Sequence, residues 1–167
     1  MSKCPVCIAK PGSHCFFKIG TSADINIYYC SPARSSDYMN ATAISSHLVN
    51  VLEGGKKWIW IFDCKGISAK HAIQFDTVKK LVGLLSNPKY GENIVRFIAI
   101  NMSNSAQKLL DMVLPLLTRE ARENIDKCGS SPIEIITCLQ KYSLGVDLLR
   151  WVNKIAILEV NEDLPGF

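Results

Sequence analysis

Residues 58–66 read Trp-Ile-Trp-Ile-Phe-Asp-Cys-Lys-Gly, an unbroken apolar run that closes on an acidic residue and a glycine. Both alternating sets of side chains are apolar, which is typical of a central strand covered on two sides in a parallel sheet. A second run of this kind, Ile94 to Asn101, follows after one helical segment. Strand, helix and strand in this order predict a parallel pair joined by a crossover helix.

A leucine-rich amphipathic stretch, Ser105 to Leu117, follows the second strand and is interrupted by Pro115. A proline inside a helix removes a hydrogen bond, so we expect this helix to kink or to end early. Two buried strands with an apolar helix at the end of the second can enclose a hydrophobic ligand. Core packing is an equally good interpretation of the same leucines.

The flanking segments complete the prediction of an α/β domain. Two short β-rich runs near the N-terminus predict a hairpin or two adjacent strands. Apolar residues at helical spacing predict further helices, and Ser131-Pro132-Ile133-Glu134 has the pattern of a capping box. The expected strands and helices are Cys15–Ile19, Ile25–Cys30, Ile44–Leu52, Val78–Leu85, a helical segment from Thr118 to Lys127, a helix from Ser131 to Leu139, and an edge strand within Ile155–Val160.

Length and composition fit one globular domain. The chain has 167 residues, of which 48% are hydrophobic and 20% charged, and its 19 basic and 15 acidic residues give a net charge of +4. This excess is too small and too scattered to predict nucleic-acid binding, although it favours an anionic membrane surface or a phosphate headgroup. No apolar run reaches the roughly 18 residues that a membrane-spanning helix needs.

Taken in order, these segments resemble the CRAL-TRIO domain, a lipid-binding module of the kind found in yeast phosphatidylinositol transfer protein. The matching features are the strand ending Phe62-Asp63-Cys64-Lys65-Gly66, the stretch from Asn87-Pro88 to Asn101, the helix Ser105–Leu117 that is similar to the family's mobile gate, and the segment Cys128–Leu139. The resemblance is strongest over residues 14–143. It implies a mixed, mostly parallel sheet of about five strands flanked by helices, with a gate-like helix over a hydrophobic cleft.

This sequence also departs from the family pattern. Too few residues precede the first strand to form the family's N-terminal helical bundle, and Pro88 is followed by Lys89 where phosphoinositide-binding members carry an acidic residue. We therefore expect a lipid or another small hydrophobic ligand rather than phosphatidylinositol in particular. We divide the chain into a lead-in, residues 1–13, and a single domain, residues 14–167.

The two strands and the gate-like helix supply the candidate ligand-binding residues. Alternation places the three aromatic residues of the first strand on one face, but the sequence does not say which face meets the ligand. The candidates are Trp58, Trp60, Phe62, Phe97, Ala99, Leu109, Leu110, Val113, Leu114 and Leu117.

Cysteine and histidine residues near the N-terminus raise the question of a metal. Cys4-Pro-Val-Cys7 has zinc-ligand spacing, with His14 and Cys15 close behind. No second pair of this kind follows, so two loosely held surface cysteines are the favoured interpretation, with a zinc-stabilised scaffold as the alternative. The seven cysteines are an odd number without disulfide-like spacing, and we expect reduced thiols in a cytoplasmic protein. We expect no metal and no cofactor.

Catalytic motifs are lacking in this sequence, and we expect no enzyme. Asp63, at a strand end, is better explained as a residue that caps the following turn. His47 and His71 are interpreted as single helix-region histidines that are solvated or hydrogen-bonded. The expected partners are a lipid and, transiently, a membrane surface. The alternative function is a protein-interaction module on the same fold with a filled pocket, in a monomer or a homodimer.

Overall fold

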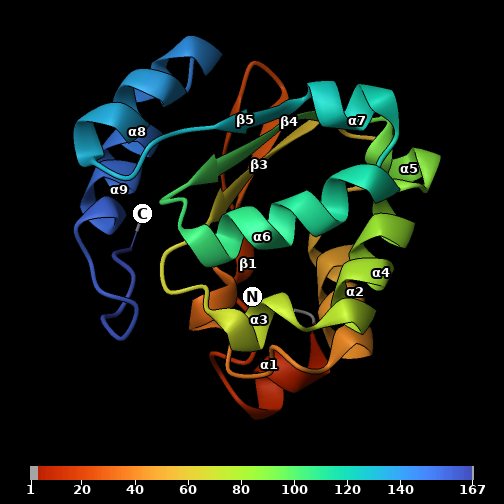
Figure 1. The fold of residues 1–167 in the computed structure, drawn as a ribbon. Helices are drawn as coiled ribbons and strands as arrows, with labels where there is room; N and C mark the ends of the chain where they lie inside the picture. Colours follow the sequence, from red (N-terminus) through yellow and green to blue (C-terminus); the bar gives the residue numbers. More distant parts are fainter. Residues whose placement is uncertain (1–3, 167) are drawn as a thin grey trace.

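A five-stranded sheet forms the centre of the computed structural model, which describes residues 4–166 (Figure 1). The strand order is β1-β2-β3-β4-β5; β1 and β2 are antiparallel, and the other neighbouring pairs are parallel. This confirms the mixed, mostly parallel sheet. The strands are β1 (Phe16–Ser22), β2 (Ile25–Cys30), β3 (Trp58–Asp63), β4 (Ile94–Ile100) and β5 (Ile125–Lys127).

The central strand β3 presents different side chains to the two faces of the sheet, as its alternation predicts. Trp58 and Trp60 join one buried cluster, whereas Ile59 and Ile61 join another. Because helices cover both faces, every one of these four side chains is at most 3% exposed. Because β3 is apolar throughout, it can pack against the helices on both faces of the sheet.

Helices form a layer on each face (Figure 1). The cluster of Ile59 and Ile61 is covered by α8 and α9, and the opposite face is covered by α2, α4 and α6. The helices are α1 (Pro5–Ala9), α2 (Ala41–Val51), α3 (Ala69–Ala72), α4 (Phe75–Leu85), α5 (Pro88–Gly91), α6 (Asn104–Val113), α7 (Arg119–Glu123), α8 (Pro132–Leu139) and α9 (Val146–Ala156).

Two local signals act as the sequence predicts. Ser131 and Glu134 form the capping box at the start of α8: the Glu134 backbone N–H donates to the Ser131 hydroxyl, and the Glu134 carboxylate accepts from the Ser131 N–H. The helix α6 ends at Val113, and Pro115 lies in a 3-10 turn, Leu114–Leu116. The proline thus ends this helix early rather than kinking it.

Two expectations about the last third of the chain are wrong. Residues 125–127 form the edge strand β5 instead of continuing a helix, because they pair with Phe97 to Ala99 of β4. Residues 155–160 form no strand: α9 continues to Ala156, since Trp151, Val152 and Ile155 lie on one helical side that is buried against the sheet. In both segments tertiary contacts override weak local preferences.

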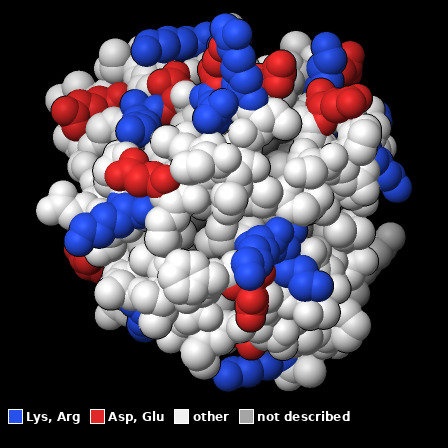
Figure 2. All heavy atoms as spheres, turned by 45° about the vertical axis from the view of Figure 1, so that its right-hand side comes forward, with Lys and Arg blue, Asp and Glu red and all other residues white. Residues whose placement is uncertain are grey.

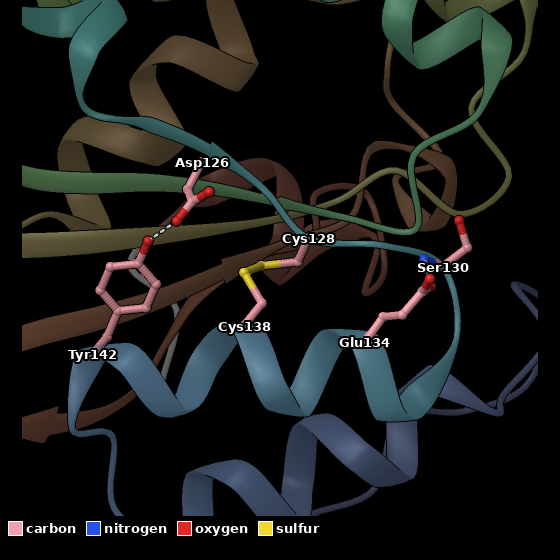
Figure 3. The surroundings of a disulfide bond; sticks show 6 residues. All are labelled: Asp126, Cys128, Ser130, Glu134, Cys138 and Tyr142. Atoms are coloured by element: carbon pink, nitrogen blue, oxygen red, sulfur yellow. Dashed lines mark hydrogen bonds between the residues drawn. A yellow bond between two sulfur atoms is a disulfide. The ribbon is translucent and has the colours of Figure 1, made fainter.

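The expectation that the cysteines are reduced is wrong for one pair. Cys128, just beyond β5, and Cys138, on the buried side of α8, form a disulfide with 5.7 Å between their Cα atoms (Figure 3). On one side of it the Tyr142 hydroxyl donates to the Asp126 carboxylate, and on the other the Ser130 N–H donates to Glu134. The bridge therefore lies in a region where β5 and α8 are already held together.

Candidate hydrophobic ligand site

Two apolar cavities lie between the sheet and the helices α2, α4 and α6. The α2 cavity is bounded by Ile44 and Leu48 of α2, and the α6 cavity by Ala106, Leu110 and Val113 of α6. Trp60 and Phe62 of β3, Val78 and Leu81 of α4, and Leu109 of α6 line both cavities. These shared side chains form the wall between the α2 cavity and the α6 cavity. The two cavities would become one if these side chains moved apart.

The sequence-predicted ligand residues fall into two groups. Most of them line the α6 cavity, namely Trp60, Phe62, Phe97, Ala99, Leu109, Leu110 and Val113. Trp58, Leu114 and Leu117 lie outside the linings of both cavities. The Trp58 indole N–H donates to the Tyr90 carbonyl at 2.9 Å, which marks it as a core residue, while Leu114 and Leu117 are half-buried in the turn after α6.

Each cavity has a volume of about 100 Å³. A buried apolar cavity of about 150 Å³ accommodates a molecule the size of benzene, and ligand pockets usually measure roughly 300–1,000 Å³. A lipid therefore needs more room than either cavity offers.

Among the polar side chains that line the α2 cavity, Trp60 and Thr77 each carry a buried donor without a good partner. The Trp60 indole N–H and the Thr77 hydroxyl are both buried, and neither makes a hydrogen bond of normal geometry. The indole interacts with the Cys30 sulfur, yet burial still raises the pKa of that thiol well above its ordinary value. Buried polar groups without good partners are rare in folded proteins, so this corner suits a ligand that brings a hydrogen-bond acceptor.

A hydrogen-bonded cluster around Asp63 fixes the loop beside the cavities. The Asp63 carboxylate accepts from the Tyr29 hydroxyl at 2.6 Å, from the Asn101 side-chain amide at 2.9 Å and from the Lys65 N–H at 3.0 Å. The last bond confirms that Asp63 caps the turn. Burial and the neighbouring Asp63 carboxylate raise the pKa of Tyr29. The role of Asp63 is thus to hold the carboxyl ends of β3 and β4 in place.

The family is established by a sequence comparison. The model of the CRAL/TRIO domain matches residues 2–142. The chain belongs to the CRAL-TRIO family. CRAL-TRIO proteins bind and transfer lipids or other small hydrophobic ligands, and they are typically not enzymes.

Solved structures agree with the CRAL-TRIO fold. The crystal structure of Sfh5 is similar with a TM-score of 0.50 at 11% sequence identity, over 68% of this chain and 47% of the Sfh5 chain. The chain therefore spans about half the length of this structural relative. A search of curated protein sequences found no match. Across residues 4–166, no helix is both long and apolar enough to cross a membrane.

Within this CRAL-TRIO domain, sequence analysis missed much of the α2 cavity. His14, Tyr38 and His71 reach it from loops and from the short helix α3, so no periodic pattern marks them. Val78 and Leu81 were predicted only as one side of a helix. A crossover helix must pack against the strands that it joins. The apolar side of this helix could therefore have predicted that Val78 and Leu81 line the cavity opposite β3.

The expectation of loosely held surface cysteines is wrong for this CRAL-TRIO domain. Cys4 is only 2% exposed and Cys7 is half-buried. Both lie close to His14, and Cys7 also lies close to His47 of α2. The backbone of the lead-in is also tied down, since the Ser36 and Asp37 N–H groups donate to Gly12 and Ser13.

Proposed function

We propose that this CRAL-TRIO domain binds a lipid or another small hydrophobic molecule in a single cleft formed when the α2 and α6 cavities join. The observation that carries this proposal is their shared wall of Trp60, Phe62, Val78, Leu81 and Leu109. Each methylene group that such a cleft removes from water contributes about 0.8 kcal/mol to binding. A short acyl chain would therefore gain several kilocalories per mole.

In this proposal α6 is the gate, because its own residues line the cavity. Pro115 lies in the turn that follows α6, so α6 ends at Val113 and does not continue as a helix into the next segment. The Lys127 ammonium donates to the Gln107 side chain at 3.0 Å, a contact at the surface that little energy is needed to break. Displacement of α6 would draw Leu109, Leu110 and Val113 away from the sheet.

The ligand would carry a polar acceptor as well as an apolar body. Its acceptor would take hydrogen bonds from the Trp60 indole and from Thr77 in the α2 cavity. The α6 cavity offers no comparable pair among its described lining residues, and burial raises the pKa of its Cys64 to about 12, which keeps that thiol neutral. The apolar part would therefore extend along β3 toward Phe97 and Ala99.

A membrane surface is the proposed source of the ligand. Exposed apolar side chains occur near the gate and near the start of α4: Leu116 is 54%, Ile73 61% and Phe75 56% exposed. Figure 2 shows one face of the molecule, on which Lys and Arg form a group at the top among Asp and Glu and a smaller group below the centre, with others scattered toward the edges. The candidate headgroup contacts from the sequence are Lys56, Lys57, Lys79, Lys80, Lys89 and Arg96.

Mass spectrometry of an organic extract tests this function directly. Protein purified without detergent, before and after incubation with mixed phospholipid vesicles, should yield one class of hydrophobic molecule at close to one per chain. Extracts that contain no such molecule under both conditions would contradict the proposal.

The second candidate function is a protein-interaction module whose cleft stays filled. The small volume of each cavity, about 100 Å³, favours it. Vesicle co-sedimentation separates the two candidates. Leu116→Asp should weaken vesicle binding if α6 is a membrane-facing gate, whereas Ile133→Asp, at an 80% exposed position of α8 across the sheet, should not. Equal vesicle binding by Leu116→Asp and the unmodified protein would favour the interaction module.

A further inference from the structure

Four potential metal ligands converge at the N-terminal end of the domain. Cys4 precedes α1, Cys7 lies in α1, His14 precedes β1, and His47 lies on α2. One ligand atom from each of these side chains lies within 4.8 Å of every other. Segments separated by more than 30 residues along the chain thus bring together two thiols and two imidazoles.

The spacing of these atoms fits a tetrahedral zinc ion. The Nδ1 atom of His14 lies 3.6 Å from the Cys4 sulfur and 3.4 Å from the Cys7 sulfur, and the Nδ1 atom of His47 lies 3.6 Å from the Cys7 sulfur. Tetrahedral coordination with Zn–S of about 2.3 Å and Zn–N of about 2.0 Å separates sulfur and nitrogen ligands by about 3.5 Å. These three sulfur–nitrogen pairs therefore already have tetrahedral spacing.

Both histidines are oriented as zinc ligands usually are. Each directs Nδ1 to the sulfur atoms and Nε2 to an oxygen: His47 Nε2 lies 2.8 Å from the Phe16 carbonyl, and His14 Nε2 lies 3.4 Å from the Asp37 carboxylate. The first contact is a hydrogen bond, while the second has the distance of an ion pair without hydrogen-bond alignment. A proton on Nε2 leaves the Nδ1 lone pair available to a metal, and partners of this kind orient metal-bound imidazoles.

Three of the four side chains are enclosed by protein, and Cys7 is half-buried. Cys4 is 2% exposed, His47 is 3% exposed, and the side chain of His14 is 3% exposed. The ring centres of the two histidines are 4.9 Å apart. Zinc binds the neutral form of imidazole, so an ion between these side chains is compatible with two rings this close.

We propose that Cys4, Cys7, His14 and His47 bind a structural Zn²⁺ ion. Two thiolates and two imidazoles in tetrahedral geometry are the ligand set that zinc prefers, and four protein ligands leave no open position for catalysis. The ion connects the residues before β1 to α2. Since His14 also lines the α2 cavity, zinc holds one wall of that cavity in place.

Metal analysis of the full chain tests the zinc site. Protein prepared under reducing conditions with added zinc and then passed through a desalting column should contain one zinc per chain. The double variant Cys4→Ser, Cys7→Ser and the single variant His47→Asn should lose the zinc. Cys15→Ser, at a buried position beside His14 but outside the cluster, should retain it and is the matched control.

Two further measurements keep the test decisive if a variant fails to fold. Unmodified protein loaded with Co²⁺ should show the absorption of a tetrahedral site with thiolate ligands, and a chelator should lower its melting temperature in both metal forms. Unmodified protein that takes up no metal, or that has Cys4 and Cys7 joined in a disulfide after reducing purification, would overturn the proposal. Retention of zinc by His47→Asn and by the cysteine variant would overturn it as well.

Discussion

The two faces of the sheet have different chemistry and differ in how completely they are packed. Toward α8 and α9 the sheet presents mainly branched aliphatic side chains, and Ile27, Ile61, Ile98 and Ile100 are fully buried there. Toward α2, α4 and α6 it presents mainly aromatic rings, and both the α2 cavity and the α6 cavity lie on that face. We call these the aliphatic face and the aromatic face.

The difference follows from the shapes of the side chains. Branched aliphatic groups interdigitate at the density of an organic crystal. Planar rings stack or meet edge to face, and here Trp60 contacts Phe62 and Phe97 edge to face with ring centres 6.0 and 5.2 Å apart. Such rings leave space where a flat surface meets a curved helix. The aliphatic face is thus suited to stabilising the fold, and the aromatic face has room that a ligand could occupy.

The largest expected effect is on the aliphatic face. Ile98→Ala should lower the free energy of unfolding by about 3–4 kcal/mol, because a fully buried side chain leaves a void that the packed layer cannot fill. The adjacent change on the aromatic face, Phe97→Leu, should cost less than about 1.5 kcal/mol, since Phe97 is half-buried and already borders a cavity. Urea denaturation measures the free energy of unfolding of both variants. Equal losses in the two variants would contradict the difference in packing between the two faces.

The disulfide should give the next largest effect. Cys128 and Cys138 are 10 positions apart, and closing a loop of that length stabilises a protein by about 2–3 kcal/mol in the chain-entropy account. Cys138→Ser should therefore lower the free energy of unfolding by that amount under oxidising conditions. A reducing agent should lower the stability of the unmodified protein equally and leave the variant unchanged. An effect of the reductant on the variant would contradict this assignment.

A smaller effect is expected from the polar corner of the aromatic face. Thr77→Val keeps the shape of the side chain and removes the hydroxyl, so ligand affinity should fall about three- to tenfold through the loss of one hydrogen bond. Titration of the lipid identified by mass spectrometry measures this change. Thr137→Val on the exposed side of α8 is the matched control and should leave the affinity unaltered. An unaltered affinity in Thr77→Val as well would exclude this corner as the polar contact.

The smallest expected effect concerns pH. Burial, followed by the neighbouring Lys70 charge, lowers the pKa of His71 below its ordinary value of 6.5. The Ser68 N–H donates to His71 Nδ1, a bond that protonation removes. The unfolded chain therefore binds this proton more readily than the folded protein, and stability falls as the pH drops below about 6.5. Denaturation curves between pH 7 and pH 5 should show a shallower loss in His71→Gln.

The sequence was sufficient to predict what local patterns determine. The two-sided apolar runs of β3 and β4, the capping box at Ser131 and the helix end before Pro115 all follow from neighbouring residues. The resemblance to the CRAL-TRIO domain then supplied the mixed, mostly parallel sheet of about five strands. Most of the predicted ligand residues line one cavity because alternation along β3 and β4 fixes the face on which they lie.

Features that depend on distant segments could not be predicted. Residues 125–127 form the strand β5 because they pair with the edge of β4. Cys138 forms a disulfide with Cys128 because α8 folds back over the sheet. His47 was interpreted as a single histidine because nothing near it in the sequence resembles a ligand. Only the packing of α2 against β1 brings it to Cys7 and His14.

The central claim is that the aromatic face, and not the aliphatic face, holds the ligand. Two matched substitutions test it most directly: Ala106→Leu fills the α6 cavity, and Ala156→Leu adds the same volume to the aliphatic layer at a similarly buried position. The measurement is the amount of lipid extracted per folded chain after incubation with vesicles. We predict loss of lipid in Ala106→Leu and near one-to-one lipid in Ala156→Leu. Equal lipid in the two variants would contradict the account.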